Sequence, residues 1–241
     1  IHAAKIAFLA SNIQDECITP LNIKDDLSII NHQLLHIHKI CKQVDEQAHH
    51  NKTSYASLYF MAPGLGHGLR IKGTLCHQGT HINFNITQIY FHCARAAARA
   101  DIWSAHSLPA LNVQQLIQHS PFLLLKTMNA QGETEISPRG DHAGFVNYIA
   151  DKVLLVPERP GNKVAISLRN IIENSEIELL FLMPGSNYTL SVTGTAEVIS
   201  DPALLSRCAI NKKAPKLGIR VRINTKHLND HSTFDKSGIW D

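Results

Sequence analysis

Two stretches of the chain match each other without a gap, at a constant offset. Residues 58–74 (LYFMAPGLGHGLRIKGT) align with residues 179–195 (LLFLMPGSNYTLSVTGT), and Leu, Phe, Pro-Gly, Leu and Gly-Thr recur in the same register. The apolar positions between them are exchanged only for other apolar residues. This pattern predicts one domain written twice. The copies differ in charge, because the first has Arg70 and Lys72 where the second has Ser191 and Thr193.

The repeat extends to both sides of this segment, so it describes whole domains. Residues 12–16 (NIQDE) resemble residues 129–133 (NAQGE), and residues 99–103 (RADIW) resemble residues 236–240 (KSGIW). The longer spacing in the second copy indicates an insertion over residues 201–216, with helix-start and loop signals. We therefore expect a first domain over residues 1–106 and a second over residues 107–241.

The composition is that of an ordinary soluble protein. A chain of 241 residues is long enough for two domains with cores of their own. No apolar run approaches the ~18 residues that span a membrane, and no signal segment is recognisable, so a cytoplasmic location without membrane contact is expected. A net charge of +3 is too small to indicate nucleic acid. The five scattered cysteines, without a Cys-x-x-Cys pair, favour reduced thiols.

Hydrophobic patterns predict many short strands and few helices. Residues 189–199 alternate between apolar and polar side chains, as in a half-buried strand. Other strands are expected over residues 122–127, 152–156, 178–183 and 217–223, and helices over residues 33–47, 113–119, 163–174 and 202–208. The expected fold is mainly β, with a small barrel in each half.

The second copy contains the motifs ISPRGDHAGF (136–145), LLVPERPGNK (154–163) and Arg169-Asn170, and the first copy contains FHCAR (91–95) and DIW (101–103). Together these motifs resemble a known family, the FMN-binding split barrels related to pyridoxamine 5'-phosphate oxidase. The resemblance covers the second copy nearly throughout and the first mainly over residues 59–103. It implies two tandem split barrels that form an intrachain pseudo-dimer.

The same motifs suit the phosphate of a flavin. Arg139 and Arg159 have forked donors that match phosphate oxygens, and Lys163 adds a point charge. Gly161 permits close approach of the backbone, and Asn162 is placed to cap the following helix. The family resemblance implies that this loop binds FMN. The residues assigned to it in the second copy are Ser137, Arg139, Gly140, Pro157, Arg159, Gly161, Asn162 and Lys163.

The first copy lacks this loop but has charges that the second lacks. Its residues 31–36 (NHQLLH), which we align with the loop, contain neither glycine nor arginine. We therefore expect one composite FMN site per chain, with a far wall from Arg70, Lys72, His92 and Arg95, and a vacant pseudosymmetric site. The alternative is that these basic residues are solvated or pair with carboxylates at an ordinary contact between domains. Trp103 and Trp240 recur in both copies, which favours a packing role.

The sequence leaves the reaction open. We expect an FMN-dependent oxidoreductase of a small molecule, with NADH or NADPH as an electron donor; Arg70 and Lys72 would favour a reduced anionic flavin and His92 would donate a proton. No catalytic residue is assigned, and vitamin B6 oxidation is not expected. The alternatives are a flavin-binding protein without catalysis and a haem-binding or haem-degrading split barrel. The fifteen histidines show no third ligand beside His36/His38 or His49/His50, so no metal site is expected. Pairing into a homodimer stays open.

Overall fold

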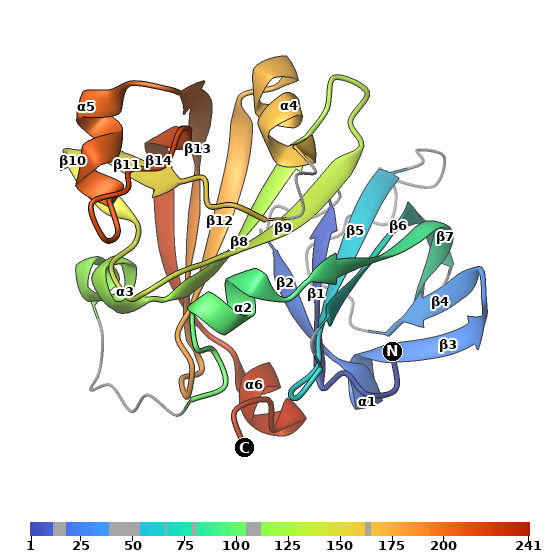
Figure 1. The fold of residues 1–241 in the computed structure, drawn as a ribbon. Coiled ribbons are helices and arrows are strands. Elements are labelled where there is room, and N and C mark those ends of the chain that lie inside the picture. Colours follow the sequence, from blue (N-terminus) through green and yellow to red (C-terminus); the bar gives the residue numbers. More distant parts are fainter. Residues whose placement is uncertain (12–17, 39–53, 66, 79–80, 105–111, 162–164) are drawn as a thin grey trace.

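The chain folds into two seven-stranded antiparallel sheets with few short helices, in a computed structural model. The structure describes residues 1–11, 18–38, 54–65, 67–78, 81–104, 112–161 and 165–241. Figure 1 shows the two sheets side by side, each curved around its own core. The architecture is that of tandem split barrels. Within the described residues, no helix is long and apolar enough to cross a membrane.

The first barrel is built from residues 6–93. Its elements are β1 (Ile6–Ser11), β2 (Thr19–Asn22), α1 (Ile23–Asp26), β3 (Leu27–Asn31), β4 (Leu34–Ile37), β5 (Ser54–Met61), β6 (His67–Gln78) and β7 (His81–Cys93). The strand order is β2-β1-β5-β6-β7-β4-β3. Helix α2 (Arg95–Arg99) follows β7 and leads towards the second barrel (Figure 1).

The second barrel is built from residues 113–230. Its elements are α3 (Val113–His119), β8 (Phe122–Met128), β9 (Thr134–Gly140), β10 (Asn147–Ala150), β11 (Val153–Pro157), α4 (Ile166–Glu173), β12 (Glu176–Leu182), β13 (Tyr188–Ile199), α5 (Pro202–Leu205), the 3-10 turn η1 (Ser206–Cys208) and β14 (Gly218–Asp230). Helix α6 (Ser232–Ser237) ends the chain. Read from the other edge, the strand order β9-β8-β12-β13-β14-β11-β10 repeats that of the first sheet.

Local sequence explains the predicted elements that are confirmed. Helix α3 begins with a capping box in which Asn112 and Gln115 each bond the other's backbone N–H. In the insertion, the Asp201 side chain accepts from two backbone N–H groups and Pro202 occupies the first turn of α5. Strand β14 is longer than predicted, because its exposed polar residues from 224 onward still pair with β13.

The helix predicted over residues 33–47 is wrong where it can be compared. Residues 34–37 form strand β4, which pairs with β7, and residues 39–47 lie outside the described part of the chain. Leu35 and Ile37 are buried while Leu34 and His36 are half-buried. This alternation of burial has the period of a strand. The sequence did not show it, because a short apolar run does not distinguish a strand from a helix.

The three largest hydrophobic clusters of the described residues hold the molecule together. One fills each barrel, and a central core joins them, with side chains such as Phe8 and Met61 from the first barrel against Phe122 and Leu182 from the second. Polar contacts cross the same boundary, since the Ser57 hydroxyl donates to the Thr134 carbonyl at 2.7 Å. Burial of this apolar area makes the two barrels one packed unit.

Trp103 and Trp240 lie beside the central core at matching positions of the two copies. Their ring centroids are 6.4 Å apart, and Trp240 also stacks on Phe234 with 6.1 Å between centroids. Its indole N–H donates to the Ser186 carbonyl at 3.1 Å. Neither tryptophan lines the cavity described below. Trp240 thus has the predicted packing role, whereas Trp103 is 39% exposed and contacts the Trp240 ring.

Candidate functional site

A cavity lies between the barrels and is lined by both. The first barrel and α2 contribute Arg70, His92, Cys93, Arg95 and Arg99. The second barrel contributes Ser137, Arg139, Gly140, Pro157, Arg159 and Gly161 from β9, the end of β11 and the loop after it. The structure thus brings together nine of the twelve residues that the sequence predicted. Asn162 and Lys163 lie outside the described residues, and Lys72 does not line the cavity.

Two arginines of the second barrel are held by carboxylates. Arg159 forms an ion pair with Asp141 and donates to the Cys208 carbonyl at 2.9 Å. Arg139 forms an ion pair with Glu158. The Asp141 side chain is 1% exposed and the Glu158 side chain 26%. The Arg159–Asp141 pair is therefore part of the framework, whereas the Arg139–Glu158 pair lies on the accessible side of the cavity.

Arg99 is a site residue that the sequence reasoning missed. Its Nε donates to the Gly140 carbonyl at 3.1 Å and its Nη1 to the Pro160 carbonyl at 3.0 Å, so helix α2 holds both the end of β9 and the loop after β11. A Cβ on Gly140 would lie 2.3 Å from the Ala96 carbonyl oxygen, so only glycine permits this approach. Arg99 is the first residue of the repeated RADIW segment, and this repeat was the sequence feature that could have identified it as a site residue.

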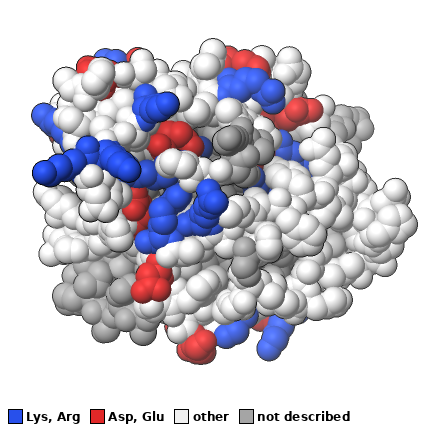
Figure 2. Space-filling view, viewed as in Figure 1, with Lys and Arg blue, Asp and Glu red and all other residues white. Residues whose placement is uncertain are grey.

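The positive charges around Arg99 are crowded. Burial lowers the pKa of its guanidinium; nearby Asp141 raises it, and Arg159 and Arg95 lower it further. Within the described residues, neither Arg95 nor Arg99 forms an ion pair with a carboxylate. Figure 2 shows basic side chains gathered over α2, in the middle of this face. The cavity mouth therefore favours anions.

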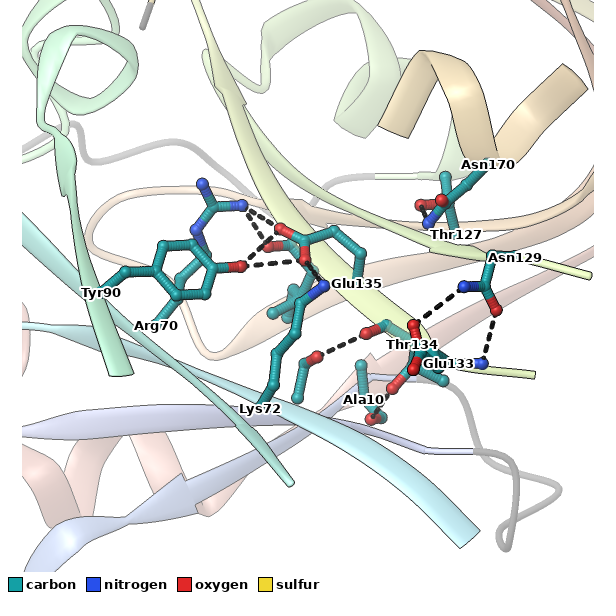
Figure 3. Close-up of polar contacts among 12 residues, drawn as sticks. Ala10, Arg70, Lys72, Tyr90, Thr127, Asn129, Glu133, Thr134, Glu135 and Asn170 are labelled. Atoms are coloured by element: carbon teal, nitrogen blue, oxygen red, sulfur yellow. Dashed lines mark hydrogen bonds and ion pairs between the residues drawn. The ribbon is translucent and has the colours of Figure 1, made fainter. Parts of the chain in front are cut away.

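A buried ionic network closes the far end of the cavity (Figure 3). Glu135 on β9 pairs with Arg70, lies 2.7 Å from the Lys72 Nζ, and accepts from the Tyr90 hydroxyl at 2.9 and 3.0 Å. The Arg70 guanidinium carbon lies 4.8 Å from the centre of the Tyr90 ring. Burial, reinforced by the Glu135 charge, raises the pKa of Tyr90.

This network corrects the role that the sequence suggested for Arg70 and Lys72. Both cations pair with one carboxylate that belongs to the other barrel, so the group of three side chains keeps one positive charge. For Lys72 the alternative reading, a charge paired at the contact between domains, is the one observed. Glu135 could not be found from the sequence, because its partners lie 45 to 65 residues away and on another sheet.

His92 lies buried against the backbone of β6. A Cβ on the opposing Gly68 would lie 1.9 Å from the His92 Cε1, so the imidazole covers a glycine, and the Tyr59 ring is 5.1 Å away between centroids. Burial, together with the Arg70 charge, lowers the pKa of His92 to about 4, although a hydrogen bond to the Gly68 backbone opposes this. His92 is therefore neutral at pH 7 and is no imidazolium acid there.

The low pKa of His92 predicts acid sensitivity. An unfolded histidine has a pKa of about 6.5, so between about pH 4 and 6.5 the unfolded state binds more protons than the folded state. Stability should therefore be complete above pH 6.5 and fall on acidification, with a slope of up to about 1.4 kcal/mol per pH unit. Urea unfolding of the wild type and of His92→Gln at several pH values in this range measures how the free energy of unfolding of each protein depends on pH. Parallel curves for the two proteins would contradict it.

Three buried nitrogen atoms of the cavity wall have no hydrogen-bond partner among the residues that the structure describes. They are Nε of Arg70, Nδ1 of His92 and Nε of Arg139. Buried polar atoms are rarely left unsatisfied in native proteins, and those that are often mark a place where a ligand or water binds. The two guanidinium nitrogens are donors, which again favours an anionic or acceptor-rich ligand.

The strand registers identify the opposite, pseudosymmetric position. Phe60 and Phe181 are equivalent in the repeat. In the first barrel Phe60 pairs with Ala7, and Ala7 pairs with Leu21. In the second barrel Phe181 pairs with Leu123, and Leu123 pairs with Arg139. Leu21 is 1% exposed, so the first copy has a core leucine where the second has a site arginine. By the same reasoning, Asn229 is the second-copy equivalent of His92, because Asn229 pairs with Thr189 as His92 pairs with Gly68.

The registers also correct our alignment of the phosphate loop. Residues 31–36 lie in the β3–β4 hairpin, whose equivalent in the second barrel is the β10–β11 hairpin and not the loop after β11. The true counterpart begins at residue 39, outside the described residues. In addition, the N-cap of α4 is Ala165, so the helix that follows the loop is not capped by Asn162 as predicted.

In the described part of the chain, no group of three or more His, Cys, Asp or Glu side chains could hold a metal ion. His36, His38 and His81 do approach one another, and the His36 and His81 rings stack with centroids 4.2 Å apart. Partial burial, together with the charges of His81 and His38, lowers the pKa of His36. His49 and His50 lie outside the described residues.

Two curved antiparallel sheets with the same strand order, packed against each other, define a tandem split-barrel protein. A family model described as "Pyridoxamine 5'-phosphate oxidase" matches residues 111–233, just over half of the chain. The chain therefore belongs to the pyridoxamine 5'-phosphate oxidase family. The match covers the second barrel and includes Ser137, Arg139, Pro157 and Arg159.

Solved structures with related folds each cover about half of the chain. HupZ of Group A Streptococcus is 18% identical with a TM-score of 0.41, over 51% of this chain and 95% of that one. General Stress Protein 26 of Bacillus anthracis is 16% identical with a TM-score of 0.39, over 48% and 89%. HutZ of Vibrio cholerae, described as a heme storage protein, is 12% identical with a TM-score of 0.36, over 49% and 91%. No curated protein matches the chain.

Proposed function

We propose that the chain binds one FMN in the cavity between the barrels and is an FMN-dependent oxidoreductase of a small molecule. The observation that carries this proposal is the convergence of five arginines from both barrels on a single cavity, together with three buried nitrogen atoms that lack partners. A phosphate with a flat, acceptor-rich ring meets both requirements. Membership of the pyridoxamine 5'-phosphate oxidase family supports the same ligand.

The residues present divide into two groups by the part of FMN that each would hold. Arg139, Arg159 and Arg99 lie around the loop after β11 and suit the phosphate. Arg70 and His92, at the other end, offer Nε and Nδ1 atoms to the ring or to a substrate beside it. When bound, the flavin would exchange electrons with a small-molecule donor such as NADH or NADPH, while the protein supplies orientation and charge.

Binding requires side chains to move. The cavity volume is about 80 Å³, well below the roughly 300–1,000 Å³ of common ligand sites. The Arg139–Glu158 pair is the more exposed of the two pairs at the loop. Opening it exchanges the Glu158 carboxylate for a ligand phosphate on Arg139, at little cost to the framework. The buried Arg159–Asp141 pair would stay in place and position the loop.

Titration with FMN tests the proposal. Flavin fluorescence and absorbance should report saturable binding at one FMN per chain, and addition of NADH or NADPH should bleach the bound flavin. Binding without enzymatic reduction would leave a flavin-binding protein that is not an oxidoreductase. Two FMN per chain would contradict the single composite site, and no binding would overturn the proposal.

Haem is a second candidate because of one residue. His92 is neutral at pH 7 and its Nδ1 has no partner, so this nitrogen is available as a ligand. A parallel titration with haem should then give a sharp Soret band that is lost in His92→Gln. A Soret band that survives this substitution would exclude His92 as the ligand. The arginine-rich lining favours FMN over haem.

A further inference from the structure

Cys93 is the thiol of this cavity, and the proposed flavin chemistry does not use it. The residue ends β7, is exposed, is free of disulfides and lines the cavity beside His92. It also borders a smaller cavity lined by Tyr59, Leu65 and Trp103. The sulfur is therefore open to small molecules from the side of the cavity mouth.

The surroundings of Cys93 are strongly positive. Arg95 and Arg99 follow it on α2, and neither is neutralised by a carboxylate of the described residues. Figure 2 shows the basic side chains over α2. A thiol in such surroundings reacts preferentially with anionic partners, because they are concentrated there and because the leaving thiolate is stabilised.

A second observation points to a ligand in this cavity. His92 lines the same cavity, is 6% exposed, and its Nδ1 has no hydrogen-bond partner among the described residues. This nitrogen can donate to or accept from a group that enters the cavity. The site thus combines a nucleophile, an anion-attracting wall and an unsatisfied buried nitrogen.

We propose that Cys93 is a modification site that forms a mixed disulfide with anionic low-molecular-weight thiols, whose carboxylates would contact Arg95 and Arg99. In this exchange the Cys93 thiolate attacks one sulfur of a symmetric disulfide, and the S–S bond breaks. A new S–S bond joins Cys93 to one half, while the other half leaves as a thiolate and takes up the proton that Cys93 released. One disulfide replaces another, so no external oxidant is needed. The adduct occupies the cavity mouth and excludes other anions.

Cys76 offers a matched control within the same chain. It is also exposed and free, but it lies on β6 outside the cavity, with its Sγ 3.8 Å from the His77 carbonyl. The flavin-free protein is treated with limiting glutathione disulfide, which is anionic, or with the neutral 2-hydroxyethyl disulfide. Peptide mass mapping then reads the modification of Cys93 and Cys76 separately. Because no flavin is present, the result is independent of the proposed function.

The expected result is a charge preference confined to Cys93. For each cysteine we take the ratio of its modification rate with glutathione disulfide to its rate with the neutral reagent. At low salt this ratio should be about tenfold higher for Cys93 than for Cys76, and added salt should reduce the difference. Arg95→Gln should lower the preference several-fold, because it removes a charge from an exposed side chain that forms no ion pair with the described residues. Equal ratios at the two cysteines, or a preference unaffected by both Arg95→Gln and salt, would overturn the proposal.

Discussion

Glu135→Gln should lower the free energy of unfolding by about 3 kcal/mol, the largest stability loss that we expect from a single substitution. The change leaves Arg70 and Lys72 without the carboxylate that they share. The loss is large because both cations are shielded from solvent, with side chains 7% and 19% exposed. Tyr90 also loses a charged acceptor. Guanidinium unfolding followed by tryptophan fluorescence and circular dichroism measures the loss.

Glu133→Gln is the control for this measurement, because Glu133 lies two residues away, is exposed and contacts Asn129. It should change stability by less than about 0.5 kcal/mol. Adding Lys72→Met to Glu135→Gln should recover part of the loss, because one uncompensated cation is then removed. A loss below 1 kcal/mol for Glu135→Gln, on the scale of surface pairs of about 0–1 kcal/mol, would show that the network is screened by solvent.

Arg139→Ala combined with Arg159→Ala should weaken FMN binding by at least about a hundredfold. Each arginine can donate charge-assisted hydrogen bonds to a phosphate, worth about 1.5–3 kcal/mol each, and about 1.4 kcal/mol corresponds to a factor of ten. Isothermal titration or flavin fluorescence gives the ratio of dissociation constants. The effect is expected in affinity and not in stoichiometry.

In this variant the buried Asp141 loses its partner, which could itself destabilise the fold. A triple variant that also carries Asp141→Asn removes the unpaired charge, so that a loss of flavin binding can be measured apart from a loss of folding. Arg220→Ala is the matched control, since Arg220 belongs to the same barrel but pairs with Glu197 on the surface, with side chains 35% and 49% exposed. Its affinity should equal that of the wild type. An unchanged affinity in the folded triple variant would rule out the phosphate role of both arginines.

The class of fold could be predicted because repeat, motifs and strand patterns agreed. The alternation of residues 189–199 predicted β13, and Asn112 with Gln115 fixed the start of α3. The helix over residues 33–47 failed because a four-residue strand carries too little pattern to be told from a helix. The length of β14 was missed because its polar end is stabilised by pairing with β13 and not by burial.

The candidate site was predictable in its residues and not in its pairings. Motifs located Arg139, Arg159 and His92. The same motifs contain Asp141 and Glu158, but they do not specify which carboxylate pairs with which arginine. Glu135 reaches Arg70 because β9 of one barrel crosses β6 of the other, and no local pattern specifies that contact. Similarly, the neutral state of His92 follows from its burial against Gly68, which requires the register of β6 and β7.

The replacement of a site arginine by Leu21 in the first barrel shows what covalent linkage of the barrels permits. In a homodimer every substitution appears twice, so a surface that binds a ligand in one copy must do the same in the other. Here the first barrel has a core leucine at the position equivalent to Arg139. The two halves of the cavity are thus free to diverge, one to hold a ligand and the other to select what reaches it.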